Sequence, residues 1–432
     1  MNYQETVNYL YNCVPMFQKE GSTAYKEGLS TTFALDKHLN HPHTKFKTIH
    51  VGGTNGKGST SHTLAAILQD AGYKVGLYTS PHLIDFRERI RVNGVTISEE
   101  FVVDFIAQNR SFYEPLYPSF FELSTSMAFD YFAKENIDVA VVEVGLGGRL
   151  DCTNIIQPDL SIITNISNDH NQFLGSTLAE IAHEKAGIIK KNTPVVIGEW
   201  VDETKKVFMD KAVFENAPIY FAQDNSLVDE SASKEIAGGW LYSTKPYAKL
   251  RGELGGYCQL KNTNTILTAL PLLKEIGYEI SELNVRNGFS TVVETTGLLG
   301  RWQELQSAPR MVCDTGHNVA GISTIVKQLS HQDYNKLHFV LGMVNDKDIR
   351  GVLALLPRDA TYYFTCASVQ RAMPVEELAS LAREKGLEGN EYPCVKEATL
   401  AALKEAGSDD FIFIGGSSFI VADLLTFWYT EQ

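Results

Sequence analysis

The chain has 432 residues, of which 44% are hydrophobic and 21% charged, and no apolar run approaches the roughly 20 residues that cross a bilayer. These values exclude a membrane-spanning protein and predict a globular one with two or three domains. The formal net charge of -14 argues against a duplex nucleic-acid partner, which would favour a basic face. Any anionic ligand must therefore be held by a local site.

The N-terminal segment and the spacing of the cysteines indicate the cellular compartment of the protein. The first 20 residues lack a basic segment followed by an apolar core and a small-residue cleavage site, so they predict a helix rather than a signal peptide. The six cysteines lie far apart without CxxC spacing, which argues against a zinc site or a disulfide framework. We therefore expect a cytoplasmic protein.

From about residue 46, short apolar runs alternate with helical stretches, the pattern of βαβ units around a mostly parallel sheet. The segment FKTIHVGG predicts a strand, and STSHTLAAILQDAG predicts a helix that stops at Gly72. The segment RIRVNGVTIS predicts a hairpin that turns at Asn93 and Gly94. Further strands are predicted at 74–80, 138–145 and 160–166.

The second half of the chain predicts helices and then a new alternating series. Residues 177–190 open with Thr177 and Glu180 in capping-box spacing, which predicts a helix start. A polar, Gly-rich stretch near 223–256 is followed by helical patterns to about residue 290. Glycines then interrupt the helix, and we place a domain boundary near residue 297. Strands are predicted beyond it at 310–314, 337–344, 361–367 and 410–416, enough for a smaller α/β domain.

The segment GGTNGKGST at 52–60 departs from the usual phosphate-binding loop. In that pattern a Ser or Thr directly follows the lysine, so that its hydroxyl can hold Mg²⁺. Here Val51 stands at the first glycine position, Gly58 intervenes, and Ser59 comes one residue late. A glycine-rich loop between a strand and a helix still points backbone N–H groups at an anion, with Lys57 as a mobile cation. The alternative is a strand-to-helix turn with an incidental lysine.

Short motifs follow one another along the whole chain. They are HVGGTNGKGST, YTSPHL, RERIRVNG, VVEVGLGGRLDCTN, NDH and HEKAGI, and then QLKN, GRWQ, DTGHN, DKD and GGSSF. In this order and spacing they resemble folylpolyglutamate synthases, which belong to the Mur ligase family of ATP-dependent amide-bond-forming ligases. The resemblance implies an α/β protein with a large N-terminal P-loop ATPase-like domain at 1–296 that binds ATP and folate. It also implies a smaller C-terminal Rossmann-like α/β domain at 297–432 that binds glutamate.

The metal question is raised by polar residues at predicted strand ends. Ser80, Glu143 and His170 each follow or end an apolar strand, and ligands gather outside the carboxyl ends of strands in an open α/β sheet. On residue types alone, each has an ordinary capping or surface role as an alternative. The resemblance implies that these three residues hold Mg²⁺.

Lys185 has two interpretations. From the sequence alone it is a solvated lysine on an amphipathic helix. The resemblance implies instead that this lysine is carbamylated and helps to hold a second Mg²⁺. Carbamylation needs a neutral amine, and burial can lower the pKa of a lysine enough to supply one.

Further roles follow from the resemblance only. It implies ATP contacts from the loop and from later motifs, at Thr54, Asn55, Gly56, Lys57, Gly58, Ser59, Thr60, Asn262, Arg301 and Asp314. It implies glutamate contacts at His317 and Ser417, and it makes Lys57, Lys185 and His170 the catalytic residues. By themselves, Arg301 equally fits a linker salt bridge and Asp314 a helix N-cap.

The folate side rests on three segments. GLSTTFALDKHLNHP resembles the segment of the family that lies on the pterin side, with Thr31 where the family usually has arginine. The residues that match pteridine-side positions are Phe120, Phe121, Glu122, Asp151, Thr153 and Asn154. Phenylalanines there could stack on a flat ring, and they fit a hydrophobic core equally well.

The implied reaction transfers the γ-phosphate of ATP to a substrate carboxylate and then lets the amine of glutamate attack the acyl phosphate. We expect addition of glutamate to folates and also to dihydropteroate, with ATP and two Mg²⁺ ions, by a monomer whose domains close over the nucleotide. The alternatives are a folylpolyglutamate synthase without the second activity, a Mur ligase acting on another acid, and a nucleotide-binding switch without catalysis. A cell-wall Mur ligase would need an additional UDP-binding domain, and only about 45 residues precede the strand that leads into the loop.

Overall fold

A computed structural model describes residues 1–13, 28–345 and 347–431, which form two compact units. Unit 1 comprises Met1–Ser167, Asn171–Glu253 and Gln259–Leu298, and unit 2 comprises Asn168–His170, Leu254–Cys258 and Leu299–Gln432. Unit 2 therefore includes two short pieces that precede the junction predicted near residue 297. Helix α1 (Tyr3–Cys13) confirms the predicted N-terminal helix as far as the described residues extend.

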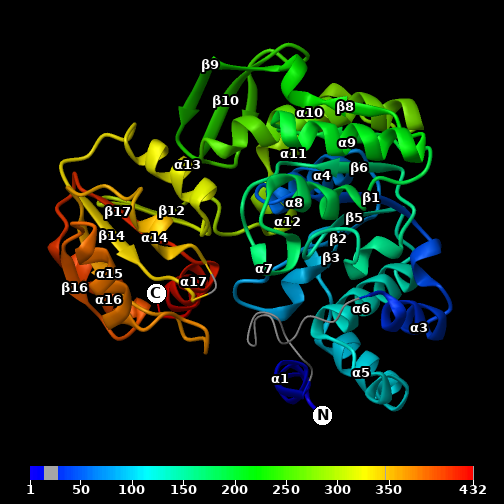
Figure 1. The fold of residues 1–432 in the computed structure, drawn as a ribbon, viewed down its shortest axis with the longest axis horizontal. Coiled ribbons are helices and arrows are strands. Elements are labelled where there is room, and N and C mark those ends of the chain that lie inside the picture. Colours follow the sequence, from blue (N-terminus) through cyan, green and yellow to red (C-terminus); the bar gives the residue numbers. More distant parts are fainter. Residues whose placement is uncertain (14–27, 346, 432) are drawn as a thin grey trace. The chain divides into compact units, whose positions relative to one another are not determined.

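Unit 1 contains an eight-stranded sheet with the order β4-β3-β2-β5-β1-β6-β7-β8 (Figure 1). The pairs from β2 to β8 are parallel, and β3 and β4 add an antiparallel edge. This confirms the mostly parallel sheet, in which β7 and β8 were not foreseen. The strands are β1 (Lys47–Gly52), β2 (Val75–Tyr78), β3 (Ile90–Val92), β4 (Val95–Thr96), β5 (Val139–Glu143), β6 (Leu160–Ile163), β7 (Val195–Ile197) and β8 (Ile219–Phe221).

Helices cover both faces of this sheet. Ala140 and Val142 of β5 belong to a buried cluster with residues of α1, α3, α5 and α6, and the alternate residues of β5 must face the other side. Helix α4 packs against β1, β2 and β5, and α11 packs on α4 so closely that a Cβ on Gly288 would lie 2.6 Å from the Cα of Ile67. The helices are α1, α3 (Ser30–His38), α4 (Lys57–Asp70), α5 (Glu99–Tyr113), α6 (Phe120–Lys134), α7 (Asn171–Leu174), α8 (Leu178–Ala186), α9 (Asp202–Glu215), α10 (Cys258–Ile276), α11 (Glu282–Ser290) and α12 (Val292–Thr296).

Local signals in the sequence explain several of these boundaries. The β3–β4 hairpin turns at Asn93 and Gly94, whose φ angles of 47° and 77° are those of a tight hairpin turn. Helix α8 begins at the predicted capping box, in which Thr177 accepts from the backbone N–H of Glu180. Helix α4 ends before Gly72, where φ is 91°.

The polar stretch near 223–256 is more ordered than its composition suggests. It forms a three-stranded antiparallel sheet of β9 (Val228–Ile236), β10 (Gly239–Thr244) and β11 (Leu250–Gly252). Most of β9 is exposed, whereas Trp240 and Tyr242 of β10 are buried with their rings stacked. One face of this small sheet is therefore apolar. The strands were not predicted because β9 is mostly polar and exposed, so apolar and polar residues do not alternate clearly along the sequence.

Unit 2 is a six-stranded sheet with the order β12-β13-β17-β14-β15-β16, in which only β12 is antiparallel to its neighbour. The four predicted strands are confirmed as β13 (Arg310–Asp314), β14 (Leu337–Leu341), β15 (Thr361–Phe364) and β17 (Phe411–Gly415). The edge strands β12 (Gln303–Ser307) and β16 (Gly389–Glu391) were missed. The helices are α13 (Val319–Leu329), α14 (Ile349–Leu353), α15 (Val375–Glu384), α16 (Val395–Glu405) and α17 (Ser418–Glu431).

Among the described residues, no helix is long and apolar enough to span a membrane.

Candidate functional site

The loop at 53–56 joins β1 to α4 and is shaped by two glycines. Gly56 precedes α4 with a φ of 83°, in the left-handed region that favours glycine. Gly53 has a φ of 134°, and a Cβ there would lie 1.9 Å from Oγ1 of Thr164. The backbone of the loop can therefore approach the end of β6 only because position 53 carries no side chain.

The residues after β6 hold this loop from behind. The backbone N–H of Thr54 donates to the carbonyl oxygen of Asn165 at 2.9 Å, and the N–H of Asn55 donates to Oδ1 of the same residue at 3.0 Å. The hydroxyl of Thr164 donates to the carbonyl oxygen of Asn55 at 2.6 Å. These bonds fix the loop before any ligand binds, and they occupy the N–H groups of Thr54 and Asn55.

The start of α4 supplies the positive features that an anion needs. Helices leave their first N–H groups without intrahelical acceptors, and these groups attract phosphate. Nζ of Lys57 lies 3.1 Å from the carbonyl oxygen of Thr54, beside the loop. Gly58, Ser59 and Thr60 are buried in the first turn, and Oγ1 of Thr60 has no hydrogen-bond partner among the described residues. A buried orphan hydroxyl next to the loop fits a missing polar ligand.

The structure brings Ser80 and Glu143 together. Ser80 follows β2, Glu143 ends the neighbouring strand β5, and the backbone N–H of Ser80 donates to Oε2 of Glu143 at 3.2 Å. The Glu143 side chain is buried, with 3% of its surface exposed. A hydroxyl and a carboxylate are hard oxygen donors of the kind that Mg²⁺ prefers. His170 belongs to unit 2 and is described with it below.

The interpretation of Lys185 as a solvated helix residue is wrong. Its side chain on α8 is only 5% exposed, and Nζ donates to the carbonyl oxygen of Gly53 at 2.9 Å. The backbone of Lys185 also packs closely on the segment after β5, because a Cβ on Gly148 would lie 3.1 Å from the Cα of Lys185. The amine of Lys185 is therefore buried against the loop at 53–56, which we call the phosphate loop.

Helix α10 adds a polar cluster next to the loop and the start of α4. Nδ2 of Asn262 donates to Oε1 of Gln259 at 2.9 Å, and Nε2 of Gln259 donates to the hydroxyl of Ser59 at 3.1 Å. A Cβ on Gly56 would lie 2.2 Å from Oδ1 of Asn262. Sequence reasoning named Asn262 and missed Gln259. The three-residue spacing, which places both on one helix face, was the available signal.

The predicted folate residues on α6 have different surroundings. Phe120 is 4% exposed and packs in the core with Phe86, with the guanidinium of Arg89 5.0 Å from its ring centre. Phe121 is partly buried, and its ring lies against the backbone of Gly145, where a Cβ would be 2.4 Å from a ring carbon. The carboxylate of Glu122 accepts from the N–H of Ser119 at 2.7 Å and caps α6.

The second folate segment forms a buried hydrogen-bonded turn. Asp151 accepts from the N–H groups of Leu146 and Thr153 at 2.8 and 3.0 Å, and burial raises the pKa of its carboxyl. The hydroxyl of Thr153 lies 2.8 Å from Nε2 of His50 on β1. Asn154 donates twice to backbone carbonyls, while its Oδ1 is buried without a partner in the described chain. Asn154 is thus the residue of this turn with a free acceptor.

In unit 2 one carboxylate gathers several groups. Asp169 is 2.6 Å from Nζ of Lys347 and 3.4 Å from Nε2 of His317, and Nδ2 of Asn318 donates to it at 3.1 Å. Burial opposes ionisation of Asp169, but the hydrogen bond from His317 and the nearby positive charges outweigh it and lower the pKa of this carboxyl. His170 follows directly with a φ of 53°. Sequence reasoning named His170 and His317 and missed Asp169 and Lys347, although both stand in quoted motifs.

The side chains of the remaining predicted residues of unit 2 form hydrogen bonds with its backbone. Asp314 accepts from the N–H groups of Trp302 and Gly316, both at 2.8 Å, whereas Asn318 caps α13, so the N-cap interpretation of Asp314 is wrong. Arg301 donates to the hydroxyl of Thr315 and to the carbonyl oxygen of Gly300. Ser417 is buried, and its hydroxyl accepts from the N–H of Phe419 at 3.1 Å at the start of α17.

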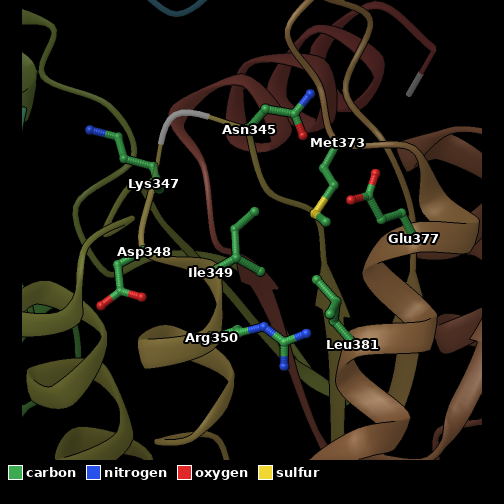
Figure 2. Close-up of a pocket in the computed structure, with 8 residues that line it drawn as sticks. All are labelled: Asn345, Lys347, Asp348, Ile349, Arg350, Met373, Glu377 and Leu381. Carbon is green, nitrogen blue, oxygen red and sulfur yellow. The ribbon is translucent and has the colours of Figure 1, made fainter. Parts of the chain in front are cut away.

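Unit 2 also contains a cavity of about 590 Å³, shown in Figure 2. It is lined by the segment around Lys347 and Arg350 and by Glu377 and Leu381 of α15, with Asn345, Asp348, Ile349 and Met373. None of the site residues predicted from the sequence lines it, so its volume carries no argument about the reaction.

Two family models match the chain. The Mur ligase middle domain matches residues 51–237, which include the phosphate loop, and the Mur ligase glutamate ligase domain matches residues 300–418.

Individual relatives match over nearly the full length. The dihydrofolate synthase/folylpolyglutamate synthase of Bacillus subtilis is 32% identical over 411 residues, which cover 92% of this chain and 94% of that protein. A solved structure of Escherichia coli FolC with DHPP and ADP has a TM-score of 0.86 at 29% identity and covers 100% of this chain and 98% of that one. The bifunctional enzyme of Yersinia pestis with AMPPNP and Mn ion has a TM-score of 0.81 at 28% identity, covering 99% and 98%. The chain therefore belongs to the dihydrofolate synthase/folylpolyglutamate synthase family of Mur ligases, and the members of this family are ATP-dependent glutamate ligases.

Proposed function

We propose that this chain uses ATP to add L-glutamate to folates and also to dihydropteroate. The observation that carries the proposal is the arrangement within unit 1. A preformed phosphate loop follows β1, the Ser80–Glu143 pair stands at the ends of β2 and β5, and Lys185 is buried behind the loop. Because these strands are parallel neighbours, the groups gather at the carboxyl ends of the strands. Open α/β sheets bind their ligands at this end.

Mg²⁺ fits the residues that are present. Ser80 and Glu143 offer hard oxygen donors, and His170, which stands in unit 2, is proposed as a third ligand. A bound Mg²⁺ would neutralise charge on the phosphates of ATP while the γ-phosphoryl group is transferred. The related Yersinia pestis structure contains Mn ion and AMPPNP, which supports a nucleotide and a divalent metal here.

A second Mg²⁺ is proposed at Lys185. A carbamate formed from the Lys185 amine and CO₂ would replace a cation with an anionic oxygen donor, and the amine must be neutral to react. The Lys185 side chain is buried beside the loop, with 5% of its surface exposed, which supports a ligand role there. The orphan hydroxyl of Thr60 and the N–H groups at the start of α4 would hold phosphate oxygens.

The reaction itself needs no protein nucleophile. An oxygen of the substrate carboxylate forms a bond to the γ-phosphorus of ATP, the bond to ADP breaks, and an acyl phosphate results. The amine of glutamate then forms the amide bond, the carbon–oxygen bond to phosphate breaks, and the amine nitrogen loses a proton. Lys57 and the loop would stabilise the charge on the transferred group, the usual source of catalysis in phosphoryl transfer.

The acid substrate is proposed to bind near α6 and the 151–154 turn. Phe121 is partly buried and can offer its ring face, and Asn154 has a buried free acceptor, whereas Phe120 and Asp151 shape the segment from within. The related structure of Escherichia coli FolC contains DHPP together with ADP, which supports a small-molecule substrate site in addition to the nucleotide site. In unit 2, His317 and Ser417 are proposed for glutamate, with Arg301 and Asp314 for ATP. We expect a monomer.

The test is phosphate release from ATP with dihydropteroate and with tetrahydrofolate in parallel, each with and without glutamate. Glutamate-dependent release with both acids is expected. Release with tetrahydrofolate alone would restrict the chain to folylpolyglutamate synthesis. No release with either acid would favour a nucleotide-binding switch, and release only with an unrelated acid would favour another Mur-type ligase.

A further inference from the structure

Ser59 stands one residue later than the hydroxyl residue of the usual phosphate-binding loop, and its hydrogen-bond partner, Gln259, changes its role. We propose that Gln259 is a positioning residue that presents the Ser59 hydroxyl as a hydrogen-bond donor to a nucleotide phosphate and not as a metal ligand. The inference rests on the proposed nucleotide binding at this loop. It explains how the loop can tolerate Gly58 between the lysine and the hydroxyl residue.

The contact is buried and specific. Ser59 is 2% exposed and Gln259 is 3% exposed, although 200 residues separate them in the chain. Nε2 of Gln259 donates to the Ser59 oxygen at 3.1 Å, and the structure gives the Ser59 hydroxyl no other partner among the described residues. A serine hydroxyl has one proton and two lone pairs. Gln259 uses one lone pair, so the proton of Ser59 is left for an acceptor.

Asn262 fixes the direction of this chain of hydrogen bonds. Its Nδ2 donates to Oε1 of Gln259 at 2.9 Å, which turns the amide nitrogen of Gln259 toward Ser59. With Asn262 oriented as observed, the reverse orientation of Gln259 would set two amide NH₂ groups against each other. Asn262 and Gln259 lie one turn apart on α10, so both can reach the start of α4 from one helix face.

This direction favours a phosphate over a metal at Ser59. The amide nitrogen of Gln259 lies 3.1 Å from the serine oxygen, and its hydrogen places partial positive charge against that oxygen, which disfavours a cation there. The free proton suits a phosphate oxygen, and such charge-assisted hydrogen bonds are the stronger kind. The hard oxygen ligands for a metal stand elsewhere, at Ser80 and Glu143.

Two substitutions of Gln259 separate donor direction from packing. Gln259→Glu keeps the size and can still accept from Asn262, but its carboxylate would accept the Ser59 proton and withdraw it from the phosphate. Gln259→Met removes the donor and leaves the Ser59 proton free. Gln108→Glu on the exposed side of α5 adds the same charge as a control. The measurement is the Kd of ADP without Mg²⁺, by titration calorimetry, with thermal melts to verify folding.

The expected order is clear. Gln259→Glu should weaken Mg²⁺-free ADP binding by roughly 10- to 100-fold, Gln259→Met by less than about tenfold, and Gln108→Glu by nothing measurable. In a Ser59→Ala background the extra loss from Gln259→Glu should shrink to about that of Gln259→Met, because no serine proton remains to be withdrawn. An unchanged extra loss would indicate charge repulsion alone and would overturn the inference. If Gln259→Glu does not fold, the Kd of ADP is compared in Gln259→Met, Ser59→Ala and the double variant. Losses of affinity that do not add would support the contact, and additive losses would overturn the inference.

A second measurement tests the metal. The Mg²⁺ concentration that gives half-maximal phosphate release should be unchanged in Ser59→Ala and increased in Glu143→Ala. A raised Mg²⁺ requirement in Ser59→Ala, with unaltered Mg²⁺-free ADP affinity, would make Ser59 a metal ligand and refute the proposal. A parent protein that binds no ADP would refute the proposed function instead, so the two failures are distinguishable.

Discussion

The side-chain nitrogen of Lys185 donates a hydrogen bond to the carbonyl oxygen of Gly53 at 2.9 Å. This contact joins α8 to the phosphate loop across 132 residues of sequence and buries an amine where a metal-binding oxygen is proposed.

Carbamylation of Lys185 predicts dependence on CO₂. Enzyme prepared in CO₂-depleted buffer should lose glutamate-dependent phosphate release and regain it with bicarbonate, while intact mass shows the gain of one CO₂. Lys185→Arg keeps a long cationic side chain that forms no stable carbamate, and it should reduce the rate by about 100-fold or more. An unmodified lysine in a fully active preparation would contradict the carbamate.

The loop and the strand ends should contribute unequally to catalysis. Lys57→Ala removes the mobile cation at the phosphates and should abolish measurable ligation. Glu143→Ala should cost more activity than Ser59→Ala, because Glu143 is proposed to hold Mg²⁺ whereas Ser59 contributes one hydrogen bond. The check is kcat and KM for ATP in all three variants, and a greater loss in Ser59→Ala than in Glu143→Ala would reverse this division.

Gly53 should tolerate no side chain, in contrast to Gly72, another glycine with a positive φ. Gly53→Ala would place a Cβ 1.9 Å from Oγ1 of Thr164, whereas Gly72, with a φ of 91°, has no atom within 4 Å of such a Cβ. We expect Gly72→Ala to cost about 1 kcal/mol through backbone strain alone. Gly53→Ala should displace the loop and abolish ADP binding. Equal ADP affinities in the two variants would show that the close approach to Thr164 is not needed.

The two phenylalanines of α6 should separate stability from substrate binding. Phe120 is 4% exposed in the core, and Phe120→Ala should lower the free energy of unfolding by about 3 to 5 kcal/mol. Phe121→Ala should be less destabilising and should mainly raise KM for the folate substrate, since its ring is only partly buried. Urea unfolding and steady-state kinetics on both variants provide the check, and an unchanged folate KM in Phe121→Ala would argue against stacking.

Acid should destabilise the fold through His50. Burial, together with the nearby positive charge of Lys190, lowers the pKa of His50 from 6.5 to about 3. Because the folded pKa lies below the unfolded one, protonation favours the unfolded chain. The contribution is fully present above pH 6.5 and falls by about 1.4 kcal/mol for each pH unit below it, until the folded pKa is reached.

His50→Gln should flatten this part of the pH dependence. The difference in urea midpoint between the parent and His50→Gln is expected to change between pH 7 and about 5, a window above the ordinary pKa values of carboxyl groups. His183→Gln alters an exposed histidine and serves as the control. A parent and a His50→Gln variant that lose stability in parallel would show that His50 is not the acid-sensitive group.

Much of the architecture could be predicted because local physics specifies it. Apolar runs located β1, β2, β5 and β6, capping residues located the start of α8, and Asn93–Gly94 located the hairpin. The short edge strands β8, β12 and β16 were missed, since few of their residues are buried and their periodicity is weak. The sheet of β9 to β11 was missed for a similar reason, because its polar outer face masks the alternation.

The sequence by itself determined the family, because the motifs and their order are properties of the chain, and it named most of the residues that are proposed to carry the chemistry. Tertiary structure alone decided which partner each residue has. Burial turned Lys185 from a surface lysine into a loop contact, β-sheet order placed Ser80 beside Glu143, and helix packing brought Gln259 to the misplaced Ser59. These contacts join segments 63 to 200 residues apart, and no local pattern encodes such a meeting, since it depends on how strands and helices pack.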